Sequence, residues 1–155
     1  MHSFPQTLIL RHRRENLKKC SLRGLESRPD CTFYTYPKHK LPSLEGYILL
    51  CLDAPLLTAN DASKGIFLID GTWRHTETMF AQLCSPHLFE MRSLPSHFQT
   101  AYPRRQEDCK DPKRGLASVE ALYAAYHILQ RPTAGLLDHY HWKDLFISNN
   151  NLHPL

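Results

Sequence analysis

Length and composition limit this chain to one domain. With 155 residues, of which 42% are hydrophobic, it can bury one proper core, so we expect a single domain over residues 1–155. The first twenty residues hold only a short apolar run, Leu8 to Leu10, far below the ~20 residues that cross a bilayer, so we expect a cytoplasmic protein with no membrane partner.

The net charge of +4 is unevenly distributed along the sequence. Residues 1–41 carry nine lysines and arginines against three acidic residues, a net charge of +6, so the remainder carries −2. We therefore divide the chain into a basic N-terminal lobe, about residues 1–45, and a near-neutral part, about residues 46–150. A positive lobe is typical of proteins that bind a polyanion such as RNA, although scattered surface lysines give similar counts.

The cysteines and histidines form no known disulfide or metal pattern. An odd number of cysteines at irregular spacings, without a CxxC pair or a secretory signal, indicates free thiols. They are Cys20, Cys31, Cys51, Cys84 and Cys109. Ten histidines are many for this length, and "HYH" at residues 139–141 could serve a metal. Because there is no HExxH motif and no zinc-finger spacing, we expect no metal site.

Short apolar and β-branched runs predict strands along the chain. The clearest is "GIFLID", in which four apolar residues, Ile66–Ile69, indicate a buried strand that ends at Asp70. The other predicted strands are residues 7–12, 31–37, 46–53 and 87–95. Residues 57–65 predict a helical turn that ends at Gly65.

Three stretches have the apolar spacing of a helix. After residue 72, one helical face is formed by Trp73, Met79, Phe80 and Leu83. The strongest helix, residues 116–130, has a stripe of Leu116, Val119, Leu122, Tyr123, Tyr126 and Leu129. The last, residues 134–147, turns Leu136, Tyr140, Leu145 and Phe146 inward. Strands alternate with helices, so we predict an α/β fold with a mainly parallel sheet flanked by helices.

The turn after the central strand carries a carboxylate, a glycine, a hydroxyl and a tryptophan. In a parallel sheet, ligands bind outside the carboxyl ends of the strands, where residues 70–73 are expected to lie. A plainer interpretation stays open, in which Asp70 caps the following helix and Trp73 is a core aromatic. No GxGxxG or GxxxxGK motif is present, so neither a dinucleotide fold nor a P-loop is supported.

Six motifs occur in the order found in the aminocarboxypropyltransferase family that acts on a hypermodified pseudouridine of small-subunit ribosomal RNA. "ENLKKCSLRGLE" resembles the family's "DPKKCTGKKL", and "GIFLIDGTW" resembles its "GLAVIDCSW". Four further motifs are "LLTANDAS", "RSLP", "LASVEALYAAYHILQ" and "HWKDLFISNN". The resemblance extends over residues 11–150, and the tRNA-modifying DTW-domain enzymes share the two central motifs.

The resemblance implies a SPOUT-like fold with a deep trefoil knot in the cofactor-binding part, about residues 46–150, and S-adenosylmethionine as the cofactor. The residues that match cofactor-binding positions of the family are Ser21, Leu50, Leu52, Ile69, Asp70, Trp73, Leu94, Arg114, Leu116 and Ser118. Leu50 and Leu52 are alternatives for one apolar wall. The residues matching Asp70 and Trp73 line the methionine part and the adenine.

The implied reaction transfers the 3-amino-3-carboxypropyl group to a base nitrogen of uridine or pseudouridine in small-subunit rRNA, during ribosome biogenesis. A ring nitrogen attacks well only once it is deprotonated. Asp70 is therefore the predicted catalytic residue, either offsetting the sulfonium charge, which we favour, or removing this proton. The alternatives are tRNA as the substrate, RNA methyl transfer from the same pocket, or a non-catalytic RNA-binding assembly factor.

The partner implied by this reaction is RNA, either free rRNA or a pre-ribosomal particle, and we expect a monomer. Five residues of the basic lobe are predicted to contact RNA phosphates: Arg11, Arg13, Arg14, Lys18 and Lys19. Their alternative role is solvated surface charge that keeps the protein soluble.

Two stretches depart from the family pattern. The family's "DCSW" is "DGTW" here, and the loop after residue 96 is longer and more charged. The loop's basic residues are Arg104, Arg105, Lys110, Lys113 and Arg114, and they suit either an RNA edge or a solvated, salt-bridged loop. We therefore expect this chain to differ from the family in two respects, the adenine contacts that the loop makes and the choice of target.

Overall fold

The structure, a computed structural model, describes residues 4–18, 20–38, 40–71, 73–83, 89–103 and 115–152. Of Trp73 it describes the backbone position but not the side chain. In this part of the chain no helix is both long and apolar enough to cross a membrane.

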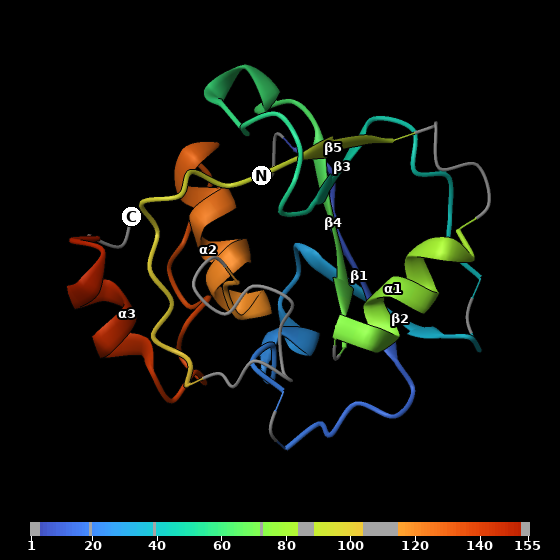
Figure 1. The fold of residues 1–155 in the computed structure, drawn as a ribbon, viewed down its shortest axis with the longest axis horizontal. Helices are drawn as coiled ribbons and strands as arrows, with labels where there is room; N and C mark the ends of the chain where they lie inside the picture. The colour runs from blue at the N-terminus through green and yellow to red at the C-terminus, as the bar shows by residue number, and fades with distance from the viewer. Residues whose placement is uncertain are drawn as a thin grey trace.

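Five parallel strands form one sheet in the order β2-β1-β4-β3-β5 (Figure 1). The strands are β1 (Thr7–His12), β2 (Cys31–Tyr36), β3 (Tyr47–Leu50), β4 (Gly65–Asp70) and β5 (Glu90–Arg92). The helices are α1 (Trp73–Ala81), α2 (Ser118–Ile128) and α3 (Lys143–Asn149), and the 3-10 helices are η1 (Leu25–Ser27) and η2 (Ala59–Asp61). The coarse prediction of an α/β fold with a mainly parallel sheet is therefore confirmed.

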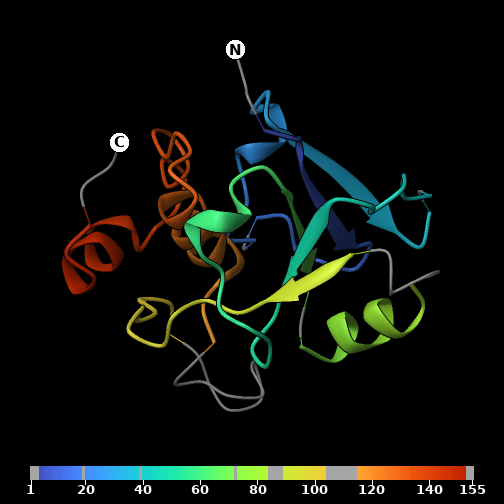
Figure 2. The same cartoon turned by 90° about the horizontal axis from the view of Figure 1, so that it is seen from above.

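Helices cover both faces of this sheet, α1 on one side and α2 with α3 on the other (Figure 2). Side chains along a strand point alternately to the two faces. Leu8 and Leu10 of β1 accordingly pack with Met79 of α1, whereas Ile9 between them belongs to the cluster under α2. The same alternation separates Phe67 from its neighbours in β4.

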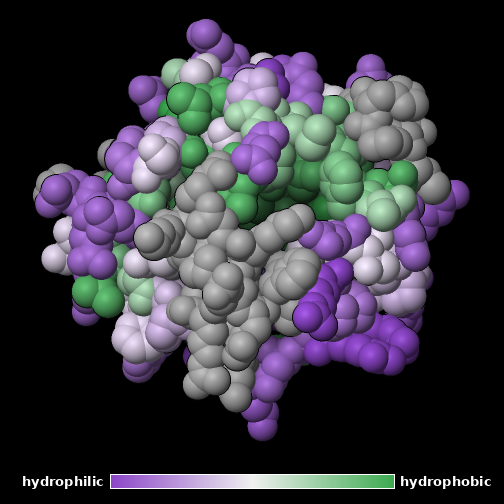
Figure 3. Space-filling view, viewed as in Figure 1, coloured by the Kyte–Doolittle hydropathy of each residue, from purple (hydrophilic) through white to green (hydrophobic). Residues whose placement is uncertain are grey.

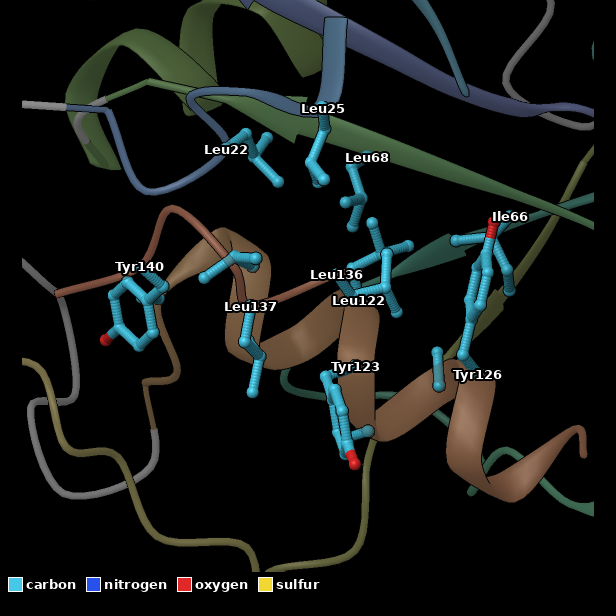
Figure 4. Close-up of a cluster of buried hydrophobic side chains, with 14 of the residues drawn as sticks. Leu22, Leu25, Ile66, Leu68, Leu122, Tyr123, Tyr126, Leu136, Leu137 and Tyr140 are labelled. Carbon is cyan, nitrogen blue, oxygen red and sulfur yellow. The ribbon is translucent and has the colours of Figure 1, made fainter. Parts of the chain in front are cut away.

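The larger core lies between the sheet and α2 (Figure 4). Ile66 and Leu68 of β4 face Leu122 and Tyr126 of α2 in this cluster. Further apolar side chains from two connecting segments complete it: Leu22, Leu25, Leu136, Leu137 and Tyr140. The segment between β1 and β2 is therefore anchored in the core, which fixes the basic lobe against the sheet.

The strongest patterns predicted their elements well. Strands at 7–12 and 31–37 and the helix at 116–130 lie within one or two residues of β1, β2 and α2. Gly65 is the first residue of β4 and does not end the preceding turn. The strands predicted at 46–53 and 87–95 are shorter, because the chain turns away after Leu50 and after Arg92.

The predicted helix at 134–147 is wrong over its first nine residues. Gly135 has a φ of +86°, a left-handed conformation that breaks a right-handed helix, and the chain runs in turns until α3 begins at Lys143. Of the side chains expected to point inward, Leu136, Tyr140 and Phe146 are buried, but Leu145 is 45% exposed. Phe80 of α1, also expected inward, is 36% exposed.

Neighbouring positions of α3 provide a matched test of this packing. Phe146 is fully buried and meets the ring of Tyr123 edge-on, so we expect Phe146→Ala to lower the free energy of unfolding by about 3 to 5 kcal/mol. Leu145→Ala, next to it on the exposed face, should change it by less than about 0.5 kcal/mol. Chemical denaturation of both variants measures this, and equal losses would contradict the position of α3.

Candidate active site

A cavity of about 280 Å³ opens at the carboxyl ends of β3, β4 and β5, beside the start of α2. Leucines and serines share its lining, with Leu50, Leu52, Leu94 and Leu116 among the apolar residues and Ser93, Ser96 and Ser118 among the polar ones. Figure 3 shows hydrophobic residues gathered around a hollow on the face that is seen. This size lies near the lower end of the range of small-molecule sites, roughly 300 to 1,000 Å³.

Backbone hydrogen bonds join the two loops that form one side of the cavity. The Cys51 and Leu57 amides donate to the carbonyls of Arg92 and Ser93 at 3.0 and 2.8 Å. Ser93 returns two bonds, from its amide to Pro55 O at 2.8 Å and from Oγ to Ala54 O at 2.7 Å. The wall at residues 50–52 is therefore fixed to the wall at 93–95.

A buried glutamate at the start of α2 fixes the opposite side. The carboxylate of Glu120 accepts bonds from the amides of Ala117 and Ala101, both at 2.8 Å. It also accepts from the Thr100 hydroxyl at 2.6 Å and the Tyr140 hydroxyl at 2.9 Å. The segment that carries Phe98 into the cavity wall is therefore tied to the first turn of α2.

Six of the residues predicted to bind a cofactor line this single cavity. They are Leu50, Leu52, Ile69, Leu94, Leu116 and Ser118, which come from four separate segments. Ser21 lies behind Ser118, since its Oγ accepts a bond from the Val119 amide at 3.2 Å. The Trp73 side chain and Arg114 lie outside the described residues.

Sequence analysis missed several lining residues: Cys51, Thr76, Ser93, Phe98, Gly115 and Ala121. Cys51 and Ser93 could have been predicted, because each lies near the end of a predicted strand. Phe98 and Thr76 lie away from any strand end, and only the folded chain brings them to the cavity. Glu120 was also missed, although it stands inside the recognised motif at 116–130.

Asp70 connects the cavity to a buried charged cluster. Its Oδ1 accepts a hydrogen bond from Ser118 Oγ at 2.9 Å, and its Oδ2 accepts from Cys20 Sγ at 3.2 Å and Arg11 Nε at 3.5 Å. The carboxylate is only 4% exposed. Asp70 is the last residue of β4, and its described side-chain contacts are with Ser118, Cys20 and Arg11 and not with the start of α1, so they do not support its interpretation as the helix cap.

Arg11 is the cation of this cluster, and its prediction as an RNA-contacting residue is wrong. Its side chain is only 9% exposed, because the register of β1 and β4 places it opposite Asp70. Its Nη1 also pairs with Glu26 at 3.0 Å, and its guanidinium lies 4.5 Å from the centre of the Phe33 ring. Burial opposes this charge, but Cys20, Glu26 and Asp70 outweigh it and raise the pKa of Arg11.

Two further titratable groups lie beside Asp70. Burial, together with the charge of Asp70, raises the pKa of the Cys20 thiol to about 12, so Cys20 is a protonated donor at neutral pH. Burial and then the charge of Asp70 raise the pKa of Glu15, although Arg11 partly offsets them. Glu15, Cys20 and Asp70 offer ligand atoms within 4.8 Å of one another, but a metal does not suit this group because the Arg11 cation already contacts two of them.

The other basic residues of the predicted RNA face differ from Arg11. Arg13, Arg14 and Lys18 are exposed, in the segment that follows the carboxyl end of β1. Lys19 lies outside the described residues, as do the loop residues Arg104, Arg105, Lys110 and Lys113. Cys20, Cys31 and Cys51 are free thiols as predicted, whereas Cys84 and Cys109 also lie outside that part of the chain.

No protein-family model matches this chain, and no curated protein matches it either. Among solved structures it is similar to the "SAM-dependent rRNA:acp-transferase Tsr3 from Vulcanisaeta distributa", with a TM-score of 0.72 and 24% sequence identity. The match covers 95% of this chain and 79% of that chain. At this level of identity the likeness establishes a shared α/β fold over nearly the whole chain.

The buried Arg11–Asp70 pair should contribute strongly to stability. Arg11→Met leaves the buried Asp70 carboxylate and the exposed Glu26 carboxylate without their cation, so we expect a loss of about 3 to 5 kcal/mol in the free energy of unfolding, most of it from Asp70. Asp70→Asn should also destabilise, and the double variant should lose less than the sum of the two, by about 1 to 3 kcal/mol. Denaturation of the four proteins measures this coupling, and strict additivity would contradict it.

Proposed function

We propose that this chain transfers the 3-amino-3-carboxypropyl group from S-adenosylmethionine to a base nitrogen of uridine or pseudouridine in small-subunit rRNA. One observation carries the proposal. Six residues that match cofactor positions of the aminocarboxypropyltransferase family converge on a single cavity, in a fold similar to that of an rRNA acp-transferase. Four separate segments contribute them, so the convergence does not follow from their sequence spacing.

The lining of the cavity offers both apolar and polar groups that suit the parts of S-adenosylmethionine. Leu50, Leu94 and Leu116 offer flat apolar walls suited to an adenine ring, and backbone groups at Ile69 suit a ribose. Ser118 provides a hydroxyl at the end of the cavity next to Asp70. When bound, S-adenosylmethionine supplies an electrophilic methylene carbon beside its sulfonium.

The charge beside the cavity also fits a cationic donor. Asp70, Glu26 and Glu15 surround one guanidinium, that of Arg11, and the Cys20 thiol is neutral. This cluster therefore keeps an excess of negative charge after its internal ion pairs are formed. A sulfonium bound at the Ser118 end of the cavity would lie close to that excess.

RNA is the proposed partner, and the exposed basic residues support it. Arg13, Arg14 and Lys18 extend from the same edge of the sheet at which the cavity opens. Phosphate contacts there would position a nucleotide over the site without reading its sequence. The SPOUT-like classification with its trefoil knot is part of this proposal, and its support is the parallel order in which β4 lies between β1 and β3.

Labelled donors test the reaction directly. With S-adenosylmethionine carrying label in its carboxyl group, small-subunit rRNA should become labelled, whereas label in the methyl group should stay with the released thioether. Scintillation counting of purified rRNA and tRNA measures both. Methyl label in RNA would identify a methyltransferase. Carboxyl label found only in tRNA would show that tRNA, and not rRNA, is the substrate. A protein that binds RNA but no donor in calorimetry would be an assembly factor.

The RNA face can be tested separately from the cavity. Arg13→Glu with Arg14→Glu should weaken RNA binding and reduce the slope of log affinity against log salt by about 1.4 to 1.8, if each arginine neutralises one phosphate. Affinity for S-adenosylmethionine should not change. The control, Lys40→Glu with Lys143→Glu, makes the same change in net charge at an exposed lysine and at a partly buried one that pairs with Asp138. Equal effects of the two pairs on RNA affinity would mean that only overall charge matters.

A further inference from the structure

Among the described residues, Glu15 is the carboxylate of the charged cluster that accepts no hydrogen bond from the other members. Arg11 donates through Nε to Asp70, through Nη1 to Glu26 and through Nη2 to Cys20, so each of its three nitrogens is directed to another group. Among the described residues no hydrogen bond reaches the Glu15 carboxylate, although an oxygen of it lies within 4.8 Å of Asp70 and Cys20 ligand atoms. Glu15 therefore lies beside Asp70, whose other oxygen reaches Ser118 at the cavity, and no described hydrogen bond occupies its carboxylate.

Asp70 is poorly placed to accept a proton. Both of its oxygens already accept hydrogen bonds from Ser118, Cys20 and Arg11, and the side chain is almost fully buried. A proton arriving on Asp70 would have to displace one of these donors and break a buried ion pair. The geometry therefore suits Asp70 as a fixed charge.

Glu15 has the opposite properties. It is half-buried, at the carboxyl end of β1, where its amide donates to His12 O at 3.0 Å and holds the turn. Burial and the negative charge of Asp70 raise its pKa, which brings a carboxyl closer to the range in which a general base works at neutral pH. Among the described residues, the charged and titratable groups that act on its carboxyl are Asp70 on β4 and Arg11 on β1, and the Cys20 thiol on the following segment lies within 4.8 Å.

We propose that Glu15 is the catalytic proton acceptor of the transfer, with Asp70 as the fixed charge beside it. This role rests on the proposed function. The ring nitrogen of the target base gives its proton to a Glu15 carboxylate oxygen and forms a bond to the methylene carbon of the donor. The carbon–sulfur bond breaks, its electron pair stays on sulfur, and the neutral thioether leaves. Glu15 then releases the proton to solvent.

Glu15→Gln tests the role, with Glu45→Gln as the control at an exposed glutamate before β3. Glu15→Gln should lower kcat at saturating RNA by about 10² to 10⁴-fold, and its affinity for S-adenosylmethionine by less than about threefold. The wild-type rate should fall on acidification above the pH at which an ordinary glutamate is protonated, about 4.3. In Glu15→Gln the rate should no longer show this fall at low pH. In Glu15→Asp part of the rate should remain, and the fall at low pH should be seen again.

The titration of Glu15 can also be measured directly, without following the reaction. Carboxyl ¹³C NMR of the free protein should show Glu15 titrating above the exposed glutamates, and Asp70→Asn should lower its pKa by removing the neighbouring charge. A raised pKa makes the Glu15 carboxylate destabilising above that pKa, so Glu15→Gln should be at least as stable as the wild type at pH 7.

Three results would overturn the role: a kcat of Glu15→Gln within threefold of the wild type, a loss of rate that only parallels a loss of donor binding, or a Glu15 titration that Asp70→Asn leaves unchanged. If the wild-type protein itself transfers no carboxyl label to RNA, the proposed function fails, and this role fails with it.

Discussion

The ion pair between Arg11 and Asp70 holds the active-site edge of the sheet together. Parallel pairing of β1 and β4 places the two residues opposite each other, where each strand ends. Asp70 then reaches Ser118 at the start of α2, while Arg11 reaches Glu26 and Cys20 in the segment that leads to β2. One buried guanidinium and one buried carboxylate thus fix three separate parts of the chain around the cavity, and a change in strand register would separate all of them.

The cavity itself depends on backbone and packing more than on polar side chains. Its walls at 50–52 and 93–95 are joined by main-chain hydrogen bonds, and its third wall is held to α2 by the four donors that Glu120 accepts. Its charged group lies at the end where Ser118 meets Asp70, although Thr76, Ser93 and Ser96 also line the cavity. Such a site separates two tasks, since apolar walls hold a ligand and one charged end determines what happens to it.

The sequence predicted those parts of the fold that depend on local pattern. β1, β4 and α2 have unbroken apolar periodicity, and the motif matches placed Leu94 and Ser118 at one site although 23 residues separate them in the chain. Arg11 was wrongly assigned to the surface because charge counting treats every arginine as solvated, and its partner Asp70 is 59 residues away. The helix at 134–147 failed at Gly135, whose left-handed conformation overrides a helical pattern in its neighbours. Phe98 and Thr76 enter the cavity only through tertiary packing, which no local pattern records.

The charge balance of the cluster couples the donor to the proposed base. Without a ligand, three carboxylates share one guanidinium, and the repulsion from Asp70 contributes to the raised pKa of Glu15. A sulfonium bound beside Asp70 would supply positive charge and would lower that pKa, since an opposite charge favours the ionised form of a carboxyl. A bound donor would therefore favour the ionised form of Glu15 that the proposed step requires. The Arg11–Asp70 pair is essential to this coupling, because it holds the Asp70 carboxylate in place while the charge next to it changes.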